Sequence, residues 1–287
     1  MTPRYVQPEA EERYRALTRA AAGTVVGLDF DGTLAPIVDD PEQAHIHPDA
    51  RDVLVELAGQ VRAIAVVTGR PARQVLALGG LEAVGTAVGD AGCELHVFGQ
   101  YGHERWGSSA RRIVSPRPPA GLASFERELP RLLRDLDATD AFVEEKGLAV
   151  AIHTRRMADP DRALARLREP LTALAQRHGL GVEPGKQVVE IRSAQMHKGL
   201  VVRRLADDLA AEGLLFAGDD LGDLEAFAAL RDLGSRGLPT LRVLSSSAEN
   251  RTLEDRVDVV VPGPDGVLDL LTRFARDARE MDRLTRR

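Results

Sequence analysis

The clearest chemical signature in the sequence is a pair of aspartates, Asp29 and Asp31, followed directly by Gly32 and Thr33. Residues two apart in an extended chain point to the same side, so both carboxylates face one site, and Gly32 allows the backbone to turn away. A helix cap or a turn would explain one aspartate here, but not two. Because two adjacent carboxylates repel each other, the pair indicates a cation. Mg²⁺ fits, since it takes one or two carboxylates together with phosphate oxygens and water.

A second acidic group follows another apolar segment, where Asp219 and Asp220 are adjacent and Asp223 comes three residues later. Acidic residues also favour the first turn of a helix, and for this group alone the two explanations are equally good. Together with Asp29 at the end of a different apolar segment, metal binding is preferred. We therefore predict a magnesium site with Asp29, Asp31, Asp219 and Asp220 as its residues.

A hydroxyl and a lysine are candidates for binding a phosphate group. Thr68 and Gly69 lie where an apolar segment runs into a helix, so the hydroxyl and nearby backbone amides can contact phosphate oxygens. Lys198 opens a predicted helix and can stabilise negative charge. Each alone would be an ordinary turn or surface lysine. Their order along the chain, between the two acidic groups, favours the functional interpretation.

The elements that must position these residues are short apolar strands alternating with helices. The strand-like segments are 24–30, 61–67, 214–217, 241–244 and 257–261, and helical patterns cover 71–78 and 221–230. Such alternation predicts an α/β fold with a Rossmann-like parallel sheet covered on both faces. The carboxyl ends of parallel strands share one edge of the sheet, which is where Asp29, Thr68 and Asp219 are expected.

The middle of the chain has a different pattern. Helical segments at 122–136 and 162–178 alternate with strand-like segments at 142–153 and 186–192. This is an α+β arrangement. We therefore predict a core domain of residues 1–104 and 193–287, with a second domain of residues 105–192 inserted into it.

Composition limits the classes of partner. With a formal net charge of -6, 44% hydrophobic and 29% charged residues, the 287 residues are typical of a soluble globular protein. The negative balance argues against nucleic acid or a membrane as a partner. The first 23 residues lack a secretory signal, and the single cysteine, Cys93, cannot form an intrachain disulfide. We expect a cytoplasmic monomer that acts on a small molecule.

The order of these motifs resembles that of the haloacid dehalogenase superfamily, whose phosphatases form an aspartyl-phosphate intermediate. The resemblance covers residues 24–99 and the segment from 193 to the C-terminal strands. It implies that Asp29 is the nucleophile. It also implies that Asp31 is the acid/base, which protonates the leaving alcohol and later activates water.

The same resemblance assigns the remaining core residues. It implies that Thr68 and Lys198 bind the phosphate group of the substrate. It also implies that Asp219 holds Mg²⁺ together with Asp29 and the main-chain carbonyl of Asp31.

The inserted domain resembles the cap of trehalose-6-phosphate phosphatases, which remove phosphate from a disaccharide. The similar segments are 68–70, 143–155 and 185–192. The sugar-contacting residues that this implies are Glu144, Lys146 and Glu190, with Arg70, His153, Arg155 and Lys186 as companions. The resemblance therefore implies hydrolysis of trehalose 6-phosphate, with Mg²⁺ as the cofactor and the cap choosing the substrate.

Two departures from that family pattern leave alternatives open. Residues 90–94 lack the histidine-glycine pair that usually precedes a glutamate, and Thr154 stands where the family often has a tyrosine. A related sugar or cyclitol phosphate is therefore an alternative substrate. A phosphosugar mutase, whose product keeps the phosphate, is an alternative function.

The faces of the cap strands are also open. Lys146 and His153 are an odd number of residues apart, so a regular strand would put them on opposite faces unless Gly147 formed a bulge. His153 is as well explained as a cross-strand partner as it is as a ligand contact. Lys186, Glu190 and Arg192 share a face that can simply be the solvated side of the cap sheet.

Overall fold

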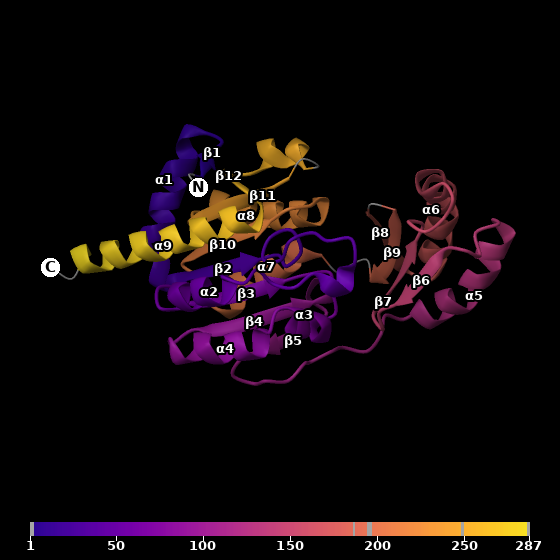
Figure 1. Ribbon diagram of the computed structural model, residues 1–287, viewed down its shortest axis with the longest axis horizontal. Coiled ribbons are helices and arrows are strands. Elements are labelled where there is room, and N and C mark those ends of the chain that lie inside the picture. The colour runs from indigo at the N-terminus through magenta and orange to yellow at the C-terminus, as the bar shows by residue number, and fades with distance from the viewer. Residues whose placement is uncertain (1–2, 186, 194–196, 248–249, 286–287) are drawn as a thin grey trace. The chain divides into compact units, whose positions relative to one another are not determined.

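The chain divides into two units in the computed structural model (Figure 1). The residues that it describes are 3–185, 187–193, 197–247 and 250–285. One unit, here called the core, spans residues 1–114 and 197–287, and the other, the cap, spans residues 115–196. The insertion predicted at 105–192 begins before the cap does. Glu104–Gly107 is a strand of the core sheet, paired antiparallel with Glu94–Gly99, and the sequence patterns did not indicate it.

An eight-stranded sheet forms the centre of the core, in the order β1-β12-β11-β10-β2-β3-β4-β5. The strands from β12 to β4 are parallel, and the edge strands β1 and β5 are antiparallel to their neighbours. The bounds are β1 Arg4–Tyr5, β2 Thr24–Leu28, β3 Ala63–Val67, β4 Glu94–Gly99, β5 Glu104–Gly107, β10 Gly213–Gly218, β11 Thr240–Ser246 and β12 Val259–Pro262. Every residue of β2, β3 and β10 is buried, as continuous apolar runs are when helices cover both faces.

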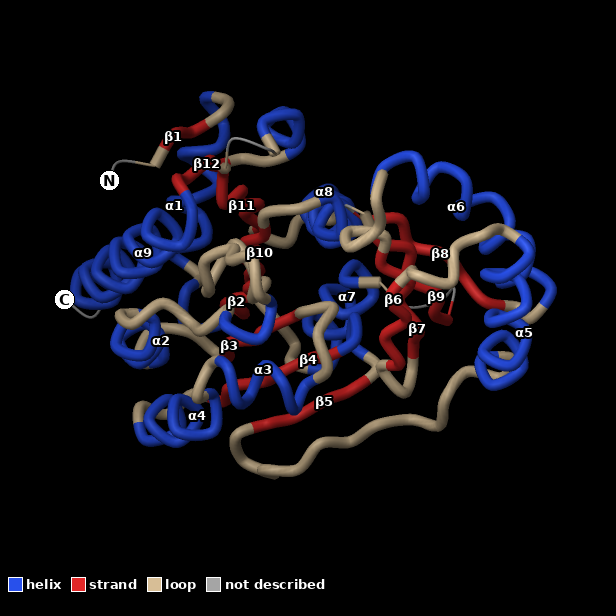
Figure 2. Tube along the Cα trace, turned by 45° about the vertical axis from the view of Figure 1, so that its right-hand side comes forward, coloured by secondary structure: helices blue, strands red, loops and turns tan. Residues whose placement is uncertain are grey.

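Helices pack on both faces of this sheet, which confirms the predicted α/β fold (Figure 2). One apolar layer joins the sheet to α1, α2, α3, α4 and α9, and the other joins it to α7 and α8. The bounds are α1 Pro8–Arg19, α2 Ala50–Ala58, α3 Ala72–Leu78, α4 Leu81–Asp90, α7 Lys198–Asp208, α8 Leu224–Ser235 and α9 Gly263–Thr285. Among the described residues, none of the helices is long and apolar enough to span a membrane.

The register of the central strands brings their carboxyl ends to one level. Leu28, the last residue of β2, lies opposite Ala217 of β10 and Val66 of β3. The predicted site residues follow within two positions: Asp29 after Leu28, Thr68 after Val66 and Asp219 after Ala217. Three separate parts of the sequence therefore reach one edge of the sheet.

The cap is a four-stranded antiparallel sheet, in the order β6-β7-β9-β8, with two helices packed on one face. The bounds are α5 Leu122–Asp135, β6 Phe142–Glu145, β7 Ala149–His153, α6 Pro160–Arg177, β8 Leu180–Gly185 and β9 Val188–Ser193. The expected strand-like segment 142–153 is a hairpin, not a bulged strand. Its turn is at Gly147, which has a φ of 76°, and the Lys146 amide donates to the Ala149 carbonyl across it.

The cap has an apolar core of its own, so the two units should unfold separately. Phe125 of α5 is fully buried in that core, and we expect Phe125→Ala to lower the free energy of unfolding of the cap by about 3–5 kcal/mol. The single tryptophan, Trp106, is buried in the core. In urea, the transition seen by tryptophan fluorescence should therefore stay in place while far-UV circular dichroism gains an earlier phase.

The matched variant is Phe216→Ala, which removes a fully buried ring from the core. It should move the fluorescence transition instead. An equal shift of both signals in Phe125→Ala would contradict separate unfolding.

Candidate active site

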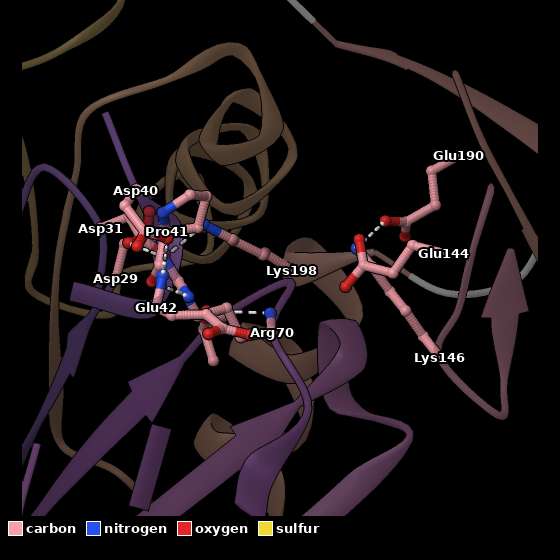
Figure 3. Close-up of polar contacts among 11 residues, drawn as sticks. Asp29, Asp31, Asp40, Pro41, Glu42, Arg70, Glu144, Lys146, Glu190 and Lys198 are labelled. Atoms are coloured by element: carbon pink, nitrogen blue, oxygen red, sulfur yellow. Dashed lines mark hydrogen bonds and ion pairs between the residues drawn. The ribbon is translucent and has the colours of Figure 1, made fainter. Parts of the chain in front are cut away.

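The carboxyl edge of the core sheet brings together residues that follow the ends of three strands, β2, β3 and β10. Figure 3 shows Asp29 and Asp31, which follow β2, beside Arg70, which follows β3. Asp29 follows β2, and its amide donates to the Ala217 carbonyl at 2.9 Å. Thr68 follows β3 and is buried, and Asp219 follows β10. Because β10, β2 and β3 are parallel neighbours in the sheet, these three residues lie at the same edge of it, as predicted.

Lys198 is buried at the start of α7 and joins two of the acidic residues. Its Nζ lies 2.9 Å from Asp29 Oδ1 and 2.7 Å from Asp223 Oδ1. The next residue is Gly199, where a Cβ would lie 2.5 Å from the Glu225 carbonyl oxygen of the adjacent helix α8. The lysine-glycine pair therefore lets α7 start close to α8, with the ammonium group directed into the site.

Four carboxylates form a cluster that can hold a metal ion. One oxygen from each of Asp29, Asp219, Asp220 and Asp223 lies within 4.8 Å of the others. Gly32 makes this approach possible: its φ is 70°, and a Cβ there would lie 2.1 Å from Asp219 Oδ2. Oxygen-only, anionic donors are what a hard divalent cation prefers.

Asp31 does not bring its side chain into this cluster. Its carboxylate accepts two hydrogen bonds from Arg70, from Nε at 2.6 Å and from a terminal nitrogen at 2.7 Å. Of the residues predicted to hold the metal, Asp31 is therefore the one whose carboxylate lies outside the cluster, and the role predicted for its main-chain carbonyl stays a prediction. Arg70 pairs with Asp31 because a planar guanidinium matches a carboxylate in fork geometry, and its predicted contact with the sugar stays a prediction.

Burial and crowding make the acidic cluster costly to ionise. Burial raises the pKa of Asp29 well above its usual value, with Lys198 opposing and the neighbouring aspartates adding to the shift. Burial, then Asp223 and Asp220, raises the pKa of Asp219 to about 8, and burial raises that of Asp223 to about 6. Burial would lower the pKa of Lys198, but Asp223 and Asp29 raise it well above its usual value. When the four carboxylates are ionised, the single ammonium group of Lys198 leaves an excess of negative charge. A divalent cation would offset part of that excess.

Asp223 also shapes the loop that carries its neighbours. It is fully buried, and its Oδ2 accepts from the amides of Asp219 at 2.9 Å and Asp220 at 3.1 Å. Gly218 leaves room for it, since a Cβ there would lie 2.3 Å from the Asp223 carboxyl carbon. The sequence had suggested Asp223 only as a minor candidate.

Asn250 is a residue that sequence reasoning missed. Its side-chain amide is buried and donates to the carbonyls of Asp219 at 2.6 Å and Ser245 at 2.9 Å. The Ser245 hydroxyl in turn donates to the Gly32 carbonyl. These bonds connect the ends of β10 and β11 to the loop after β2, and no local motif around Asn250 signals them.

A turn after β4 presses against the Thr68 segment. Gln100, Tyr101 and Gly102 all have positive φ, and the Gln100 and Tyr101 amides donate to the carbonyls of Arg70 and Thr68 at 2.8 and 2.9 Å. A Cβ at Gly69 would lie 2.7 Å from the Tyr101 hydroxyl. Backbone strain of this kind collects at functional sites.

The position of this turn corrects the interpretation of residues 90–94. That segment ends α4 and precedes β4, so it lies at the opposite end of the strand from the site. The tyrosine-glycine pair Tyr101–Gly102, followed by Glu104, occupies the site end instead. Cys93 of the 90–94 segment is buried, and burial raises the pKa of its thiol to about 11.

The face of the cap sheet that its helices do not cover carries a second charged network, formed within the cap, in which Glu190 is buried (Figure 3). Glu144 and Glu190 lie opposite Ala151 from either side, so they share a face. Lys146 Nζ lies 2.7 Å from Glu190 and 4.0 Å from Glu144, and His153 Nε2 lies 3.0 Å from Glu144. The hairpin turn thus brings Lys146 and His153 to one network.

The remaining cap residues are less involved in this network. Arg155 is exposed after β7, and Lys186 lies outside the described residues. Thr154, at the position of the family tyrosine, is buried and donates to the Gln187 carbonyl. Arg192, which the sequence suggested as a solvated neighbour, is buried and pairs with Glu183 at 2.7 Å.

Comparison with known proteins gives one family. The trehalose-phosphatase family model matches residues 27–260. A trehalose-phosphate phosphatase of Mycobacterium tuberculosis is 30% identical over 261 residues, which are 89% of this chain and 62% of the relative. An uncharacterized glycosyl hydrolase of the same species is 33% identical over 239 residues, which are 79% of this chain and 17% of the relative. The chain thus spans less than two thirds of these relatives.

Solved structures share the fold. The C-terminal domain of a C. albicans trehalose-6-phosphate phosphatase aligns with a TM-score of 0.72 at 20% identity, covering 96% of this chain and 99% of that domain. A haloacid dehalogenase-like hydrolase from Bacteroides thetaiotaomicron aligns with a TM-score of 0.60 at 14% identity, covering 87% and 98%. At these identities, the likeness concerns the fold alone.

The raised pKa values predict how metal binding depends on pH. The folded protein holds protons on Asp219 up to about pH 8, whereas the usual value is 3.8, so metal-free stability should fall as the pH rises from about 4 through 8. A divalent cation binds the ionised carboxylates, so its stabilising effect should grow over that range. Thermal melting in EDTA and in MgCl₂ should differ more at pH 9 than at pH 6.

Asp219→Asn is the control for this prediction, because it removes one of the three buried carboxylates whose pKa is raised. Its metal-induced shift in Tm should be smaller and should depend less on pH. A shift in the unsubstituted protein that is the same at pH 6 and pH 9 would contradict the prediction.

Proposed function

The chain belongs to the trehalose-phosphatase family, and on that premise we propose that it is a magnesium-dependent sugar-phosphate phosphatase, with trehalose 6-phosphate as its substrate. The observation that carries the proposal is the buried cluster at the carboxyl edge of the core sheet, in which Lys198 bridges Asp29 and Asp223 beside Asp219. A largely buried cluster of carboxylates around one lysine suits an anionic group that arrives with a cation.

Asp29 is proposed as the nucleophile. Its oxygen attacks phosphorus as the ester P–O bond breaks, which leaves an aspartyl phosphate. Lys198, 2.9 Å from Asp29 Oδ1, offsets the negative charge that collects there. The buried Thr68 hydroxyl and the amides of the Thr68–Gly69 turn are proposed to bind the phosphate oxygens.

Asp31 is proposed as the acid/base. It gives a proton to the ester oxygen as the alcohol leaves, and it later takes a proton from the water that attacks the aspartyl phosphate. Exposure separates the two roles: the Asp29 side chain is 7% exposed, and that of Asp31 is 37% exposed. The more open carboxylate is the one that can exchange protons with the alcohol and with water.

Asp29, Asp219, Asp220 and Asp223 would hold the divalent cation, together with the Asp31 carbonyl. Mg²⁺ is proposed because the donors are all oxygen. When bound, it would neutralise the carboxylates and polarise the phosphate group.

The cap network is proposed to recognise the sugar. Sugar hydroxyls both donate and accept hydrogen bonds, and Glu144, Lys146 and Glu190 present both kinds of partner on one sheet face. His153 and Arg155 are proposed as companions, and Lys186 keeps the role implied by the family resemblance. Related sugar phosphates remain substrates to be tested against trehalose 6-phosphate.

Asp29→Asn should abolish turnover, because an amide cannot serve as the nucleophile. With MgCl₂ and trehalose 6-phosphate, release of inorganic phosphate should fall by on the order of 10⁴-fold while the circular dichroism spectrum is unchanged. A phosphosugar mutase would release little phosphate even before substitution. Substantial phosphate release by the variant would remove Asp29 from the nucleophile role.

Glu190→Ala should weaken activity on the disaccharide more than on a small ester. Losing a charged hydrogen bond to the sugar predicts a fall in kcat/KM on trehalose 6-phosphate of about 10- to 100-fold, and little change on p-nitrophenyl phosphate. The control is Glu145→Ala, an exposed acid of the same hairpin on the opposite face of the sheet. Equal losses on both substrates would mean that Glu190 does not contact the sugar.

A further inference from the structure

Arg70 has an arrangement that the family resemblance did not assign. Its guanidinium donates three hydrogen bonds within the core: two to the Asp31 carboxylate at 2.6 and 2.7 Å, and one to the Pro41 carbonyl at 2.8 Å (Figure 3). Three of the five N–H donors of this side chain are thus engaged, and its charge faces an opposite charge. These contacts are those of a group that holds other groups in place.

The backbone on either side fixes where this guanidinium starts. The Arg70 amide donates to the Thr68 hydroxyl at 3.1 Å, and the Arg70 carbonyl accepts from the Gln100 amide at 2.8 Å. Pro71, the N-cap residue of α3, follows directly and restricts the residue before it. Arg70 is therefore anchored before its side chain reaches Asp31.

Arg70 is less exposed to solvent than the Asp31 carboxylate with which it pairs. The Arg70 side chain is 14% exposed, whereas that of Asp31 is 37% exposed. The guanidinium is largely covered, and the carboxylate that it holds keeps an open side.

The contact to Pro41 extends the same restraint to a second segment. Pro41–Gln43 is a single 3₁₀ turn in the loop that follows Asp31, and Asp40 caps it by accepting from the Glu42 amide. One guanidinium thus fixes both the Asp31 side chain and the loop ten residues further on. Deleting it would release the carboxylate rotamer and the loop together.

We propose that Arg70 is a positioning residue that fixes the orientation of the acid/base carboxylate of Asp31 and anchors the Pro41 turn beside it. The inference rests on the proposed function, because it takes Asp31 as the group that transfers the proton. Proton transfer requires the carboxyl oxygen at a set distance and direction from the ester oxygen, so a freely rotating Asp31 would be a weaker acid catalyst without any loss of substrate contacts.

Arg70→Lys tests this, because lysine keeps the charge but cannot form a planar fork. Phenyl phosphate and p-nitrophenyl phosphate are a matched pair of substrates that differ in how much the leaving oxygen needs a proton. We expect kcat/KM for phenyl phosphate to fall by about 10²-fold, and that for p-nitrophenyl phosphate to fall by about tenfold or less. kcat/KM is the right quantity, since it reports steps up to departure of the alcohol.

Binding is measured separately. On an Asp29→Asn background, which is expected not to turn over, the dissociation constant for trehalose 6-phosphate should change by less than about threefold when Arg70→Lys is added. On an Asp31→Asn background, Arg70→Lys should cause no further loss of kcat/KM, because the group that it positions is already disabled. Arg73→Lys, at an exposed arginine on α3, is the matched control and should leave all values unchanged.

An unchanged ratio of kcat/KM between the two aryl esters would overturn the inference, and the accompanying measurements would say what Arg70 does instead. A raised dissociation constant with an unchanged ratio between the two aryl esters would make Arg70 a substrate-binding residue. Equal losses on both esters, accompanied by a lower Tm, would make its role structural only. If the unsubstituted protein released no phosphate from any ester, the proposed function itself would fail. If the unsubstituted protein released phosphate and Asp29→Asn did not, the proposed function would stand. In that case, an unchanged ratio of kcat/KM between the two esters in Arg70→Lys would remove only the inference about Arg70.

Discussion

The structure of the core site depends on one buried ammonium group between carboxylates. Lys198 lies within 3 Å of both Asp29 and Asp223, and all three are almost wholly removed from water. Burying one of these charges alone would cost several kcal/mol, so the lysine and the aspartates are stable there only together. The negative charge that remains is of the kind that a bound cation would offset.

Much of the surrounding backbone serves this arrangement. Gly32 and Gly218 leave space that a side chain would fill, and Asn250 and Ser245 connect loops that follow different strands. Buried polar groups of this kind must all be paired to be tolerated. Asp223 follows this rule, because its buried carboxylate accepts hydrogen bonds from two backbone amides.

The two units divide the chemistry differently. The core carries its charges at strand ends, where they are held by backbone bonds and buried. The cap carries its charges on one face of an antiparallel sheet whose other face is apolar, with Glu190 and Lys146 paired across strands. A buried, preorganised cluster suits bond breaking, and a sheet face with both donors and acceptors suits recognition of hydroxyl groups.

The sequence by itself determined the parallel core sheet, the inserted α+β cap and which strand ends carry Asp29, Thr68 and Asp219, because apolar β-branched runs with polar ends are local patterns. It did not determine which partner each side chain takes. Arg70 meets Asp31 across 39 residues and Asn250 meets Asp219 across 31, and nothing local encodes such pairs. The short edge strand β5, which moved the start of the cap to residue 115, was likewise decided by pairing with β4. Only tertiary packing fixes contacts of this range, since it depends on how whole elements lie against each other.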